Sequence, residues 1–267
     1  MATRVRTQVG ALIREWRQRR RLSQLELALE TGISARHLSF VETGRSLPSP
    51  ELVLALARAL QVPYRERNRM LLAAGYAPVY RERPLDDPEM GPVRQAVERV
   101  LAGHEPYPAI AVDRAWNLVT ANASVGPLLE GASAELLEPP VNVLRLSLHP
   151  EGLAPRIENL GEWGEHLLDR LGRQVALTGD DELATLYEEL SSYPGVSPEG
   201  ASAAEPTAAD EIVATLRLRT DGGTLALFST GTTFGTAVDI TTSELAIEAF
   251  FPADERTERA LRALPRG

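Results

Sequence analysis

The fold of the N-terminal part is decided by residues 23–44, which read SQLELALETGISARHLSFVETG. Ser23 can cap a helix, and Glu26 follows three residues later, so the two form a capping box that predicts a helix start. Gly32 supplies the positive φ that a tight turn after this helix needs. A second short helix is expected over residues 35–42, where apolar side chains recur at helical spacing. Residues 23–44 therefore predict two short helices joined by a glycine-containing turn, the helix-turn-helix geometry.

Three more helices are expected around this pair. Gly10–Arg21 carries apolar residues at helical spacing, with arginines on the other face. Glu51–Leu60 follows a proline that suits the first turn of a helix, and a fifth helix follows Pro63 and runs to about Ala74. Residues 10–74 therefore predict an all-α domain of five helices.

The residues of this segment also resemble a known family. The resemblance is to the lambda-repressor/Cro-like (XRE-type) DNA-binding domain, and it covers residues 10–74. It implies that residues 35–42 form a recognition helix, whose first residues meet base edges in the major groove of duplex DNA. The residues that carry it are Ser23-Gln24-x-x-x-Ala28-x-x-x-Gly32-Ile33-Ser34 and Leu38-Ser39-x-x-Glu42-x-Gly44-Arg45-x-x-Pro48-Ser49.

Six side chains in or next to the two short helices are expected to contact DNA. Arg36 can bond to guanine through two hydrogen bonds, Ser39 can reach a base or a phosphate, and Ala35 can touch a thymine methyl group. The resemblance implies that Gln24 contacts both a DNA phosphate and the recognition helix. It also implies that Arg45 contacts the DNA backbone. The full set is Gln24, Ser34, Ala35, Arg36, Ser39 and Arg45.

Structural interpretations are also available for Arg36 and for four other polar or aromatic residues of this segment. Arg36 has the alternative of a solvated surface arginine, and His37 is expected to pack beside the turn. Glu42 is expected to bond at the helix end rather than to read cytosine. Trp16 and Phe40 are expected in the core, because helix-turn-helix domains read duplex DNA and do not stack on free bases.

Charge divides the chain at about the same place. Residues 1–83 hold 15 arginines and seven acidic residues, net +8, whereas residues 84–267 hold 13 arginines and 30 acidic residues, net −17. Phosphate backbones attract the first part and repel the second. The split predicts two domains with different partners, although a dipolar protein without a nucleic-acid partner would show the same pattern.

Composition and motifs exclude several classes of protein. The chain has no cysteine, so it has no disulfide and no Cys-based zinc site. Because no stretch approaches the roughly 20 apolar residues of a membrane helix and residues 1–10 lack a signal-peptide core, we expect a cytoplasmic protein without a membrane partner. Neither G-x-S-x-G nor H-E-x-x-H occurs, and the four histidines lack ligand spacing. We therefore expect no catalytic residue, no metal site, no cofactor and no enzyme activity.

The rest of the chain predicts a second domain of a different class. Residues 1–76 are interpreted as the DNA-binding domain, residues 77–92 as a proline-rich linker or an ordered arm, and residues 93–267 as a regulatory domain. The order of elements predicts an antiparallel sheet with helices on one side, an α+β, PAS-like domain. Helices are expected at 93–103, 156–177, 181–191 and 254–264, strands at 108–113, 116–120, 212–219, 225–236 and 243–251, a strand or a helix at 142–148, the start of a helix at 121–124, and a loop at 193–210.

This second part resembles the MmyB-like ligand-binding domain, which is found behind XRE-type modules in bacterial regulators. Ala237 stands where proline is expected in that family. The resemblance implies that the domain senses a small apolar molecule, such as a fatty acid. It rests on Ala111-Val112-Asp113-x-x-Trp116-x-Leu118-Val119-x-Ala121-Asn122, on Glu188-Glu189-Leu190-x-x-Tyr193-Pro194-Gly195, and on Thr233-Phe234-Gly235-Thr236-x-x-Asp239-x-Thr241-x-x-Glu244-Leu245-x-Ile247-Glu248-x-Phe250-Phe251-Pro252-x-Asp254.

A pocket for such a molecule needs apolar walls with a few placed polar groups. Five aromatic residues are candidate walls, with plain core packing as the alternative for each. They are Trp116, Trp163, Phe228, Phe234 and Phe250.

The sequence therefore predicts a ligand-responsive transcription regulator. We expect it to act as a homodimer on a palindromic operator in double-stranded DNA, because Cro-like modules usually bind two half-sites about 34 Å apart. A C-terminal domain that only dimerises, and an antitoxin-like interaction module, are the alternatives.

Overall fold

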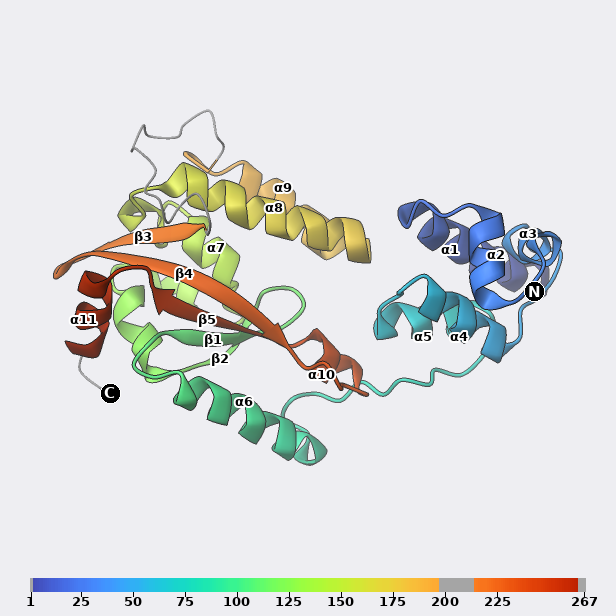
Figure 1. Cartoon of the computed structure of the whole chain (residues 1–267), viewed down its shortest axis with the longest axis horizontal. Helices are drawn as coiled ribbons and strands as arrows, with labels where there is room; N and C mark the ends of the chain where they lie inside the picture. Colours follow the sequence, from blue (N-terminus) through green and yellow to red (C-terminus); the bar gives the residue numbers. More distant parts are fainter. Residues whose placement is uncertain (1, 197–213, 264–267) are drawn as a thin grey trace. The chain divides into compact units, whose positions relative to one another are not determined.

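The structure is a computed structural model that describes residues 2–196 and 214–263. The chain forms two compact units, a smaller one made mainly of residues up to Arg83 and a larger one that begins at Pro84 (Figure 1). The predicted loop 193–210 lies largely outside the described residues.

Among the described residues, the smaller unit consists of five α-helices, which confirms the predicted all-α domain. The first helix begins well before Gly10, because residues 2–9 contain no glycine or proline. Trp16 lies in the core with 3% of its surface exposed, as expected. The helices are α1 (Ala2–Arg19), α2 (Gln24–Thr31), α3 (Ala35–Glu42), α4 (Pro50–Ala59) and α5 (Tyr64–Ala73).

The turn between α2 and α3 has the geometry that its residues predict. The Ser23 hydroxyl accepts from the backbone N–H of Glu26 at 3.2 Å, and Glu26 Oε2 accepts from the backbone N–H of Ser23 at 2.7 Å. Gly32 has φ +70°, a conformation that glycine adopts without strain. After this turn the chain enters α3 at a second capped start.

The larger unit is built on an antiparallel sheet. Among the described residues the strand order is β2-β1-β5-β4-β3, so β5 is the central strand (Figure 1). The α+β class with an antiparallel sheet is therefore confirmed. The strands are β1 (Ala109–Val112), β2 (Leu118–Ala121), β3 (Thr215–Thr220), β4 (Gly223–Thr233) and β5 (Ala246–Pro252).

Helices cover both faces of the sheet, so the expectation of helices on one side is wrong. Ala109 and Ala111 pack against α6, whereas Ile110 and Val112 pack into the larger apolar cluster of α7, α8 and α9. The physical reason is that β1 is apolar at all four positions, so both of its faces must be covered. The α-helices are α6 (Gly91–Gly103), α7 (Val143–Leu148), α8 (Leu160–Thr178), α9 (Asp181–Ser191), α10 (Ile240–Glu244) and α11 (Glu255–Ala263), and short 3₁₀ helices occupy Pro88–Met90, Ala123–Leu129, Ala134–Leu137 and Ala154–Arg156.

Several element boundaries differ from the predicted ones for local reasons. Helix α8 begins at Leu160 rather than at Arg156, because Asn159 is tied to β3: its Oδ1 accepts from the backbone N–H of Arg217 at 3.1 Å. For residues 142–148 the sequence is compatible with a strand or a helix. The structure has a helix there, α7, which Asn142 caps. The strand predicted from Ser243 begins at Ala246, after α10.

The end of segment 77–92 is ordered rather than a free linker. Asp87 caps the 3₁₀ turn Pro88–Met90, since its Oδ1 accepts from the backbone N–H of Glu89 at 2.8 Å. Met90 is 3% exposed. Residues 84–92 are therefore part of the larger unit.

Candidate DNA-binding surface and ligand cavity

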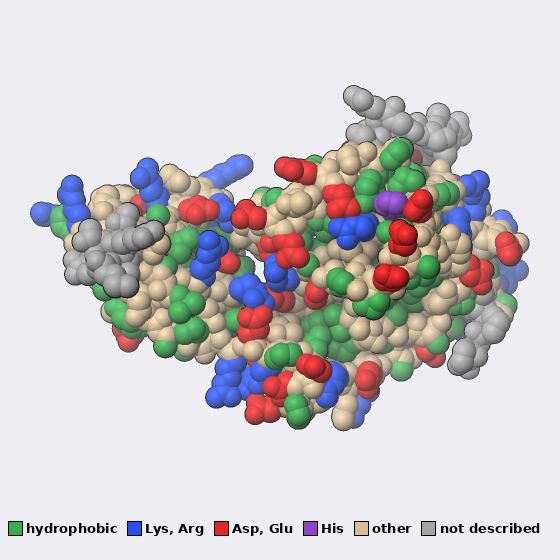
Figure 2. Space-filling view, turned by 180° about the vertical axis from the view of Figure 1, so that it is seen from behind, with side chains coloured by type: hydrophobic (Ala, Val, Ile, Leu, Met, Phe, Trp, Pro, Cys, Tyr) green, Lys and Arg blue, Asp and Glu red, His purple; other side chains and the backbone are tan. Residues whose placement is uncertain are grey.

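Helix α3 and the residues around it present the predicted DNA-contacting side chains at the surface of the smaller unit. Ser34, Arg36 and Arg45 are exposed, whereas Gln24, Ala35 and Ser39 are half-buried. Ser34 also caps α3, because its hydroxyl accepts from the backbone N–H of His37 at 3.1 Å. On the face drawn in Figure 2, arginines are prominent on the smaller unit and acidic side chains are spread over the larger one.

Phe40 brings two of the candidate arginines together. The guanidinium carbon of Arg36 lies 5.5 Å from the centre of the Phe40 ring, and that of Arg45 lies 5.7 Å from it. The backbone N–H of Arg45 also donates to the Phe40 carbonyl oxygen at 2.8 Å. The expectation that Phe40 belongs to the core is wrong, because its ring is only half-buried and supports cations. The i, i+4 spacing of Arg36 and Phe40 was the available sequence signal.

A buried polar cluster fixes α3 within the helical unit. Glu42, with 2% of its side chain exposed, accepts from Arg17 Nε at 2.7 Å and from Arg17 Nη2 at 2.9 Å. It also accepts from Gln24 Nε2 at 2.8 Å. The hydrogen bond to Glu42 raises the pKa of Arg17 above its ordinary value. Gln24 therefore connects the start of α2 to the end of α3. The carboxylate of Glu42 accepts all three of these hydrogen bonds within the protein.

Gly10 allows α1 to approach α3 closely. A Cβ atom at this position would lie 2.4 Å from the carbonyl oxygen of Val41 and 2.8 Å from that of Glu42. Contacts this short are not tolerated, so only glycine fits here without displacing α3. The close approach and the Glu42 cluster together set the position of the candidate recognition helix.

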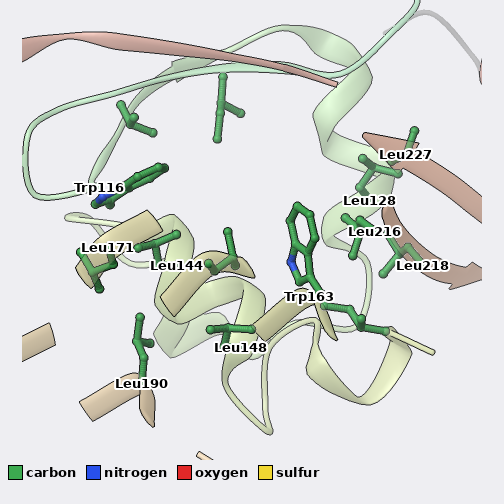
Figure 3. Packing of buried hydrophobic residues seen from close by; sticks show 14 of the residues in the cluster. Trp116, Leu128, Leu144, Leu148, Trp163, Leu171, Leu190, Leu216, Leu218 and Leu227 are labelled. Carbon is green, nitrogen blue, oxygen red and sulfur yellow. The ribbon is translucent and has the colours of Figure 1, made fainter. Parts of the chain in front are cut away.

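The larger unit contains a cavity of about 110 Å³ between the sheet and the helices of one face. Leucine is the most frequent residue type in its wall, and the leucines come mainly from α7, α8, β3, β4 and the 3₁₀ segment Ala123–Leu129. Trp116, Trp163 and Phe250 also line it, so three of the five predicted aromatic walls come together, and Figure 3 shows both indoles among the leucines.

The other two predicted walls, Phe228 and Phe234, lie elsewhere. Side chains alternate along β4, and Leu227 and Ser229 face the cavity, so Phe228 points away and stacks on Phe251 with ring centres 5.4 Å apart. Phe234 follows the last residue of β4 and packs against the cluster under α6. Neither phenylalanine is a cavity wall.

Both indoles that line the cavity have their polar atoms satisfied. Trp116 Nε1 donates to Gln174 Oε1 at 2.9 Å, and Trp163 Nε1 donates to Ser147 Oγ at 3.1 Å. Trp116 has φ +66°, a left-handed conformation that costs energy in a bulky residue and is found where surrounding structure enforces it. The two ring walls are therefore held in place by hydrogen bonds as well as by packing.

An ion pair that sequence reasoning missed also lines the cavity. Glu248 lies on the central strand β5 with 4% of its side chain exposed, and it forms a two-point pair with Arg170 of α8, in which Nη1 donates to Oε2 at 2.8 Å and Nη2 donates to Oε1. The guanidinium carbon of Arg170 lies 4.7 Å from the Trp116 ring centre. The sequence signal was an acidic residue inside the apolar run Ala246–Pro252.

Gly231 on β4 makes room for this pair. A Cβ atom there would lie 2.8 Å from Arg170 Nη2 and 3.0 Å from Glu248 Oε1. Gly231 and Glu248 are also cross-strand partners in the β4–β5 pairing. The backbone of β4 thus passes directly over the ion pair.

His166 stacks on the cavity wall Trp163, with ring centres 5.6 Å apart. Burial lowers the pKa of His166 below its ordinary value, and the nearby charges of Arg170 and Arg173 lower it further. The neutral imidazole is therefore the form that the folded chain favours.

Two kinds of feature have no counterpart in residues 2–196 and 214–263: a membrane-spanning helix and a metal-binding cluster. No helix within these ranges is long and apolar enough to cross a membrane. The same ranges contain no group of three His, Asp or Glu residues arranged to hold a metal ion.

Comparison with known proteins gives two matches to family models. Residues 93–264 match the MmyB-like transcription regulator ligand binding domain, and residues 13–67 match the helix-turn-helix family.

Curated relatives match the N-terminal part of the chain. It is 36% identical over 74 residues to an uncharacterized HTH-type transcriptional regulator, RghRB, of Bacillus subtilis strain 168, covering 27% of this chain and 51% of the relative. It is 37% identical over 68 residues to the HTH-type transcriptional repressor RghR of the same organism, covering 25% and 48%. The chain thus spans about half the length of the curated relatives it matches.

Among solved structures, the clp gene regulator ClgR from C. glutamicum matches at 30% identity, covering 27% of this chain and 88% of that chain with a TM-score of 0.24.

Proposed function

The chain belongs to the transcription regulators that carry an MmyB-like ligand binding domain, together with a helix-turn-helix module, and from this premise we propose its function. It is a sequence-specific regulator that binds double-stranded DNA through α3. It senses a small apolar molecule in the cavity of its larger unit. Fatty-acid-like compounds are the class that the family resemblance implies. As a regulator of transcription, it would act on DNA in the cytoplasm, and we assign it no catalytic role.

The observation that carries the DNA-binding proposal is the pair of arginines around Phe40. Arg36 is exposed on the first turn of α3, where a recognition helix meets base edges, and Arg45 is exposed in the loop that follows. A guanidinium group can donate two hydrogen bonds to guanine, or bind a phosphate. The net charge of +8 in residues 1–83 adds attraction to the DNA backbone.

One such unit would read only half of an operator. Specific affinity in helix-turn-helix proteins usually comes from two recognition helices on half-sites about 34 Å apart. We therefore propose a homodimer on a palindromic operator. A ligand regulates such a dimer only if it binds the DNA-competent arrangement and another arrangement with different affinities.

Selection from a library of random-sequence duplexes, with the full chain as the bait, tests DNA recognition. The expected result is enrichment of an inverted repeat whose half-sites are about one helical turn apart. If no sequence is enriched over the starting library, the proposed specific DNA binding is wrong and an interaction module of the antitoxin type becomes the better interpretation.

Native mass spectrometry of the freshly purified chain tests ligand sensing and dimerisation together. We expect a dimer mass with an additional small molecule bound to each protomer. A dimer mass without any added molecule, at every collision energy that preserves the dimer, would favour a domain that only dimerises.

A further inference from the structure

From the cavity of the larger unit, we propose that its ligand is a neutral apolar molecule with one hydrogen-bond acceptor, such as a short ester or ketone, rather than a fatty-acid anion. This inference rests on the proposed function, because it names the chemical class that the proposed sensor domain selects. The polar groups on the cavity wall carry it.

The charged groups of the wall cancel each other. Among the described residues that line the cavity, Arg170 and Glu248 are the charged ones, and they bind each other through two hydrogen bonds. An anionic ligand would either displace Glu248 from Arg170 or share the single positive charge of Arg170 with it, and in both cases one negative charge in the cavity stays uncompensated. A buried charge without a partner is strongly unfavourable, so the paired wall favours an uncharged ligand.

The ion pair is also held rigidly in its present arrangement. Arg170 is fixed by Glu248 and lies over the Trp116 ring at 4.7 Å, and the β4 backbone at Gly231 closes the space behind both groups. Trp116 itself is anchored by its hydrogen bond to Gln174. Because each neighbour is itself constrained, turning Arg170 toward a ligand carboxylate would disturb the whole arrangement.

The hydroxyl groups of the wall provide the polar contact instead. Ser147 Oγ accepts the indole proton of Trp163 at 3.1 Å, so its own proton can be donated to a ligand acceptor. Ser229, on the sheet side of the cavity, is a second hydroxyl donor. A carbonyl oxygen fits a site with hydroxyl donors and otherwise apolar walls.

The size of the cavity limits the ligand further. An engineered apolar cavity of about 150 Å³ in another protein holds benzene. The cavity here measures about 110 Å³, so the molecule that it admits without expansion is on the scale of a single ring or a short chain.

The test uses two compounds of nearly equal size: the neutral ester methyl pentanoate and its isomer hexanoic acid, which is ionised to hexanoate at pH 7.5. Calorimetric titration of the full chain with hexanoate and with methyl pentanoate should give a dissociation constant at least tenfold lower for the ester. A dissociation constant that is lower for hexanoate would overturn the inference while leaving ligand sensing intact. If neither compound binds at millimolar concentration, the inference is wrong, whereas ligand sensing is still decided separately by the native mass spectrum of the purified chain.

The Glu248→Gln variant tests the role of the ion pair directly. It removes the negative charge, keeps the size of the side chain and leaves the charge of Arg170 uncompensated. We expect hexanoate to bind this variant at least tenfold more tightly than it binds the parent. The matched control Glu165→Gln removes an exposed charge from the same helix as Arg170 and should leave the ester preference unchanged.

An unchanged ester preference in a folded Glu248→Gln variant would contradict the role given to the pair. If that variant does not fold, the comparison of the two isomers on the parent chain still decides the inference.

Discussion

Replacing Glu42 with alanine should destabilise the helix-turn-helix unit by about 3 kcal/mol. The substitution removes the acceptor of three hydrogen bonds, two from Arg17 and one from Gln24. Breaking a buried ion pair by removing one partner costs roughly 3–5 kcal/mol, because the other charge stays buried. The lower end applies here, since the Arg17 side chain is 11% exposed and still donates to the Leu22 carbonyl oxygen at 2.8 Å.

Native-state hydrogen exchange of the full chain measures this effect locally, because the two units need not unfold together. Amides of α2 and α3 in Glu42→Ala should exchange through an opening that is about 100-fold more populated than in the parent. Glu30→Ala is the matched control, since Glu30 is an exposed carboxylate on α2, and it should change the opening free energy by less than about 0.5 kcal/mol. Equal exchange in the two variants would refute the clamping role of Glu42.

Three further predictions concern the packing of α1, the support of the arginines and the half-buried His166. Gly10→Ala should destabilise the smaller unit by about 1–3 kcal/mol, because its Cβ would overlap carbonyl oxygens of α3, and urea denaturation checks this. Phe40→Leu should weaken duplex binding up to about fivefold, as two cation–π contacts of about 0.5 kcal/mol each are lost, and fluorescence anisotropy at fixed salt should reveal it. The folded chain lowers the pKa of His166, so the unfolded chain binds its proton more readily and the free energy of unfolding should fall as the pH drops below about 6.5. The difference between urea midpoints at pH 7.5 and 5.5 should therefore be smaller in His166→Gln than in the parent.

Features that depend on neighbours in sequence were predictable. The capping box at Ser23 and the left-handed turn at Gly32 are set within a few residues, so spacing alone indicated both. The segment Asn142–Leu148 was only partly predictable, because its length is compatible with both a strand and a helix. In the structure it is a helix, which Asn142 caps. Local signals thus gave the elements, and left some of their ends undetermined.

Features that depend on pairing across the fold were not predictable. Arg170 and Glu248 are 78 residues apart, and no local pattern indicates that one side chain reaches the other. The phase of β4 was equally undetermined, because Leu227 and Phe228 are both apolar and only the register with β5 shows which one faces the cavity. Phe228 was therefore assigned to the wrong face.

The central claim is that α3 reads DNA sequence, and base preference in two arginine variants tests it most directly. The duplex recovered from the random library and its single-base variants would be titrated with the parent, with Arg36→Ala and with Arg45→Ala. Arg36→Ala should lose about 1–3 kcal/mol of discrimination at one base pair of each half-site, whereas Arg45→Ala should weaken binding to all duplexes alike and reduce the salt slope by about 1. Parental affinity and parental base preference in both variants would contradict the claim that this surface contacts DNA.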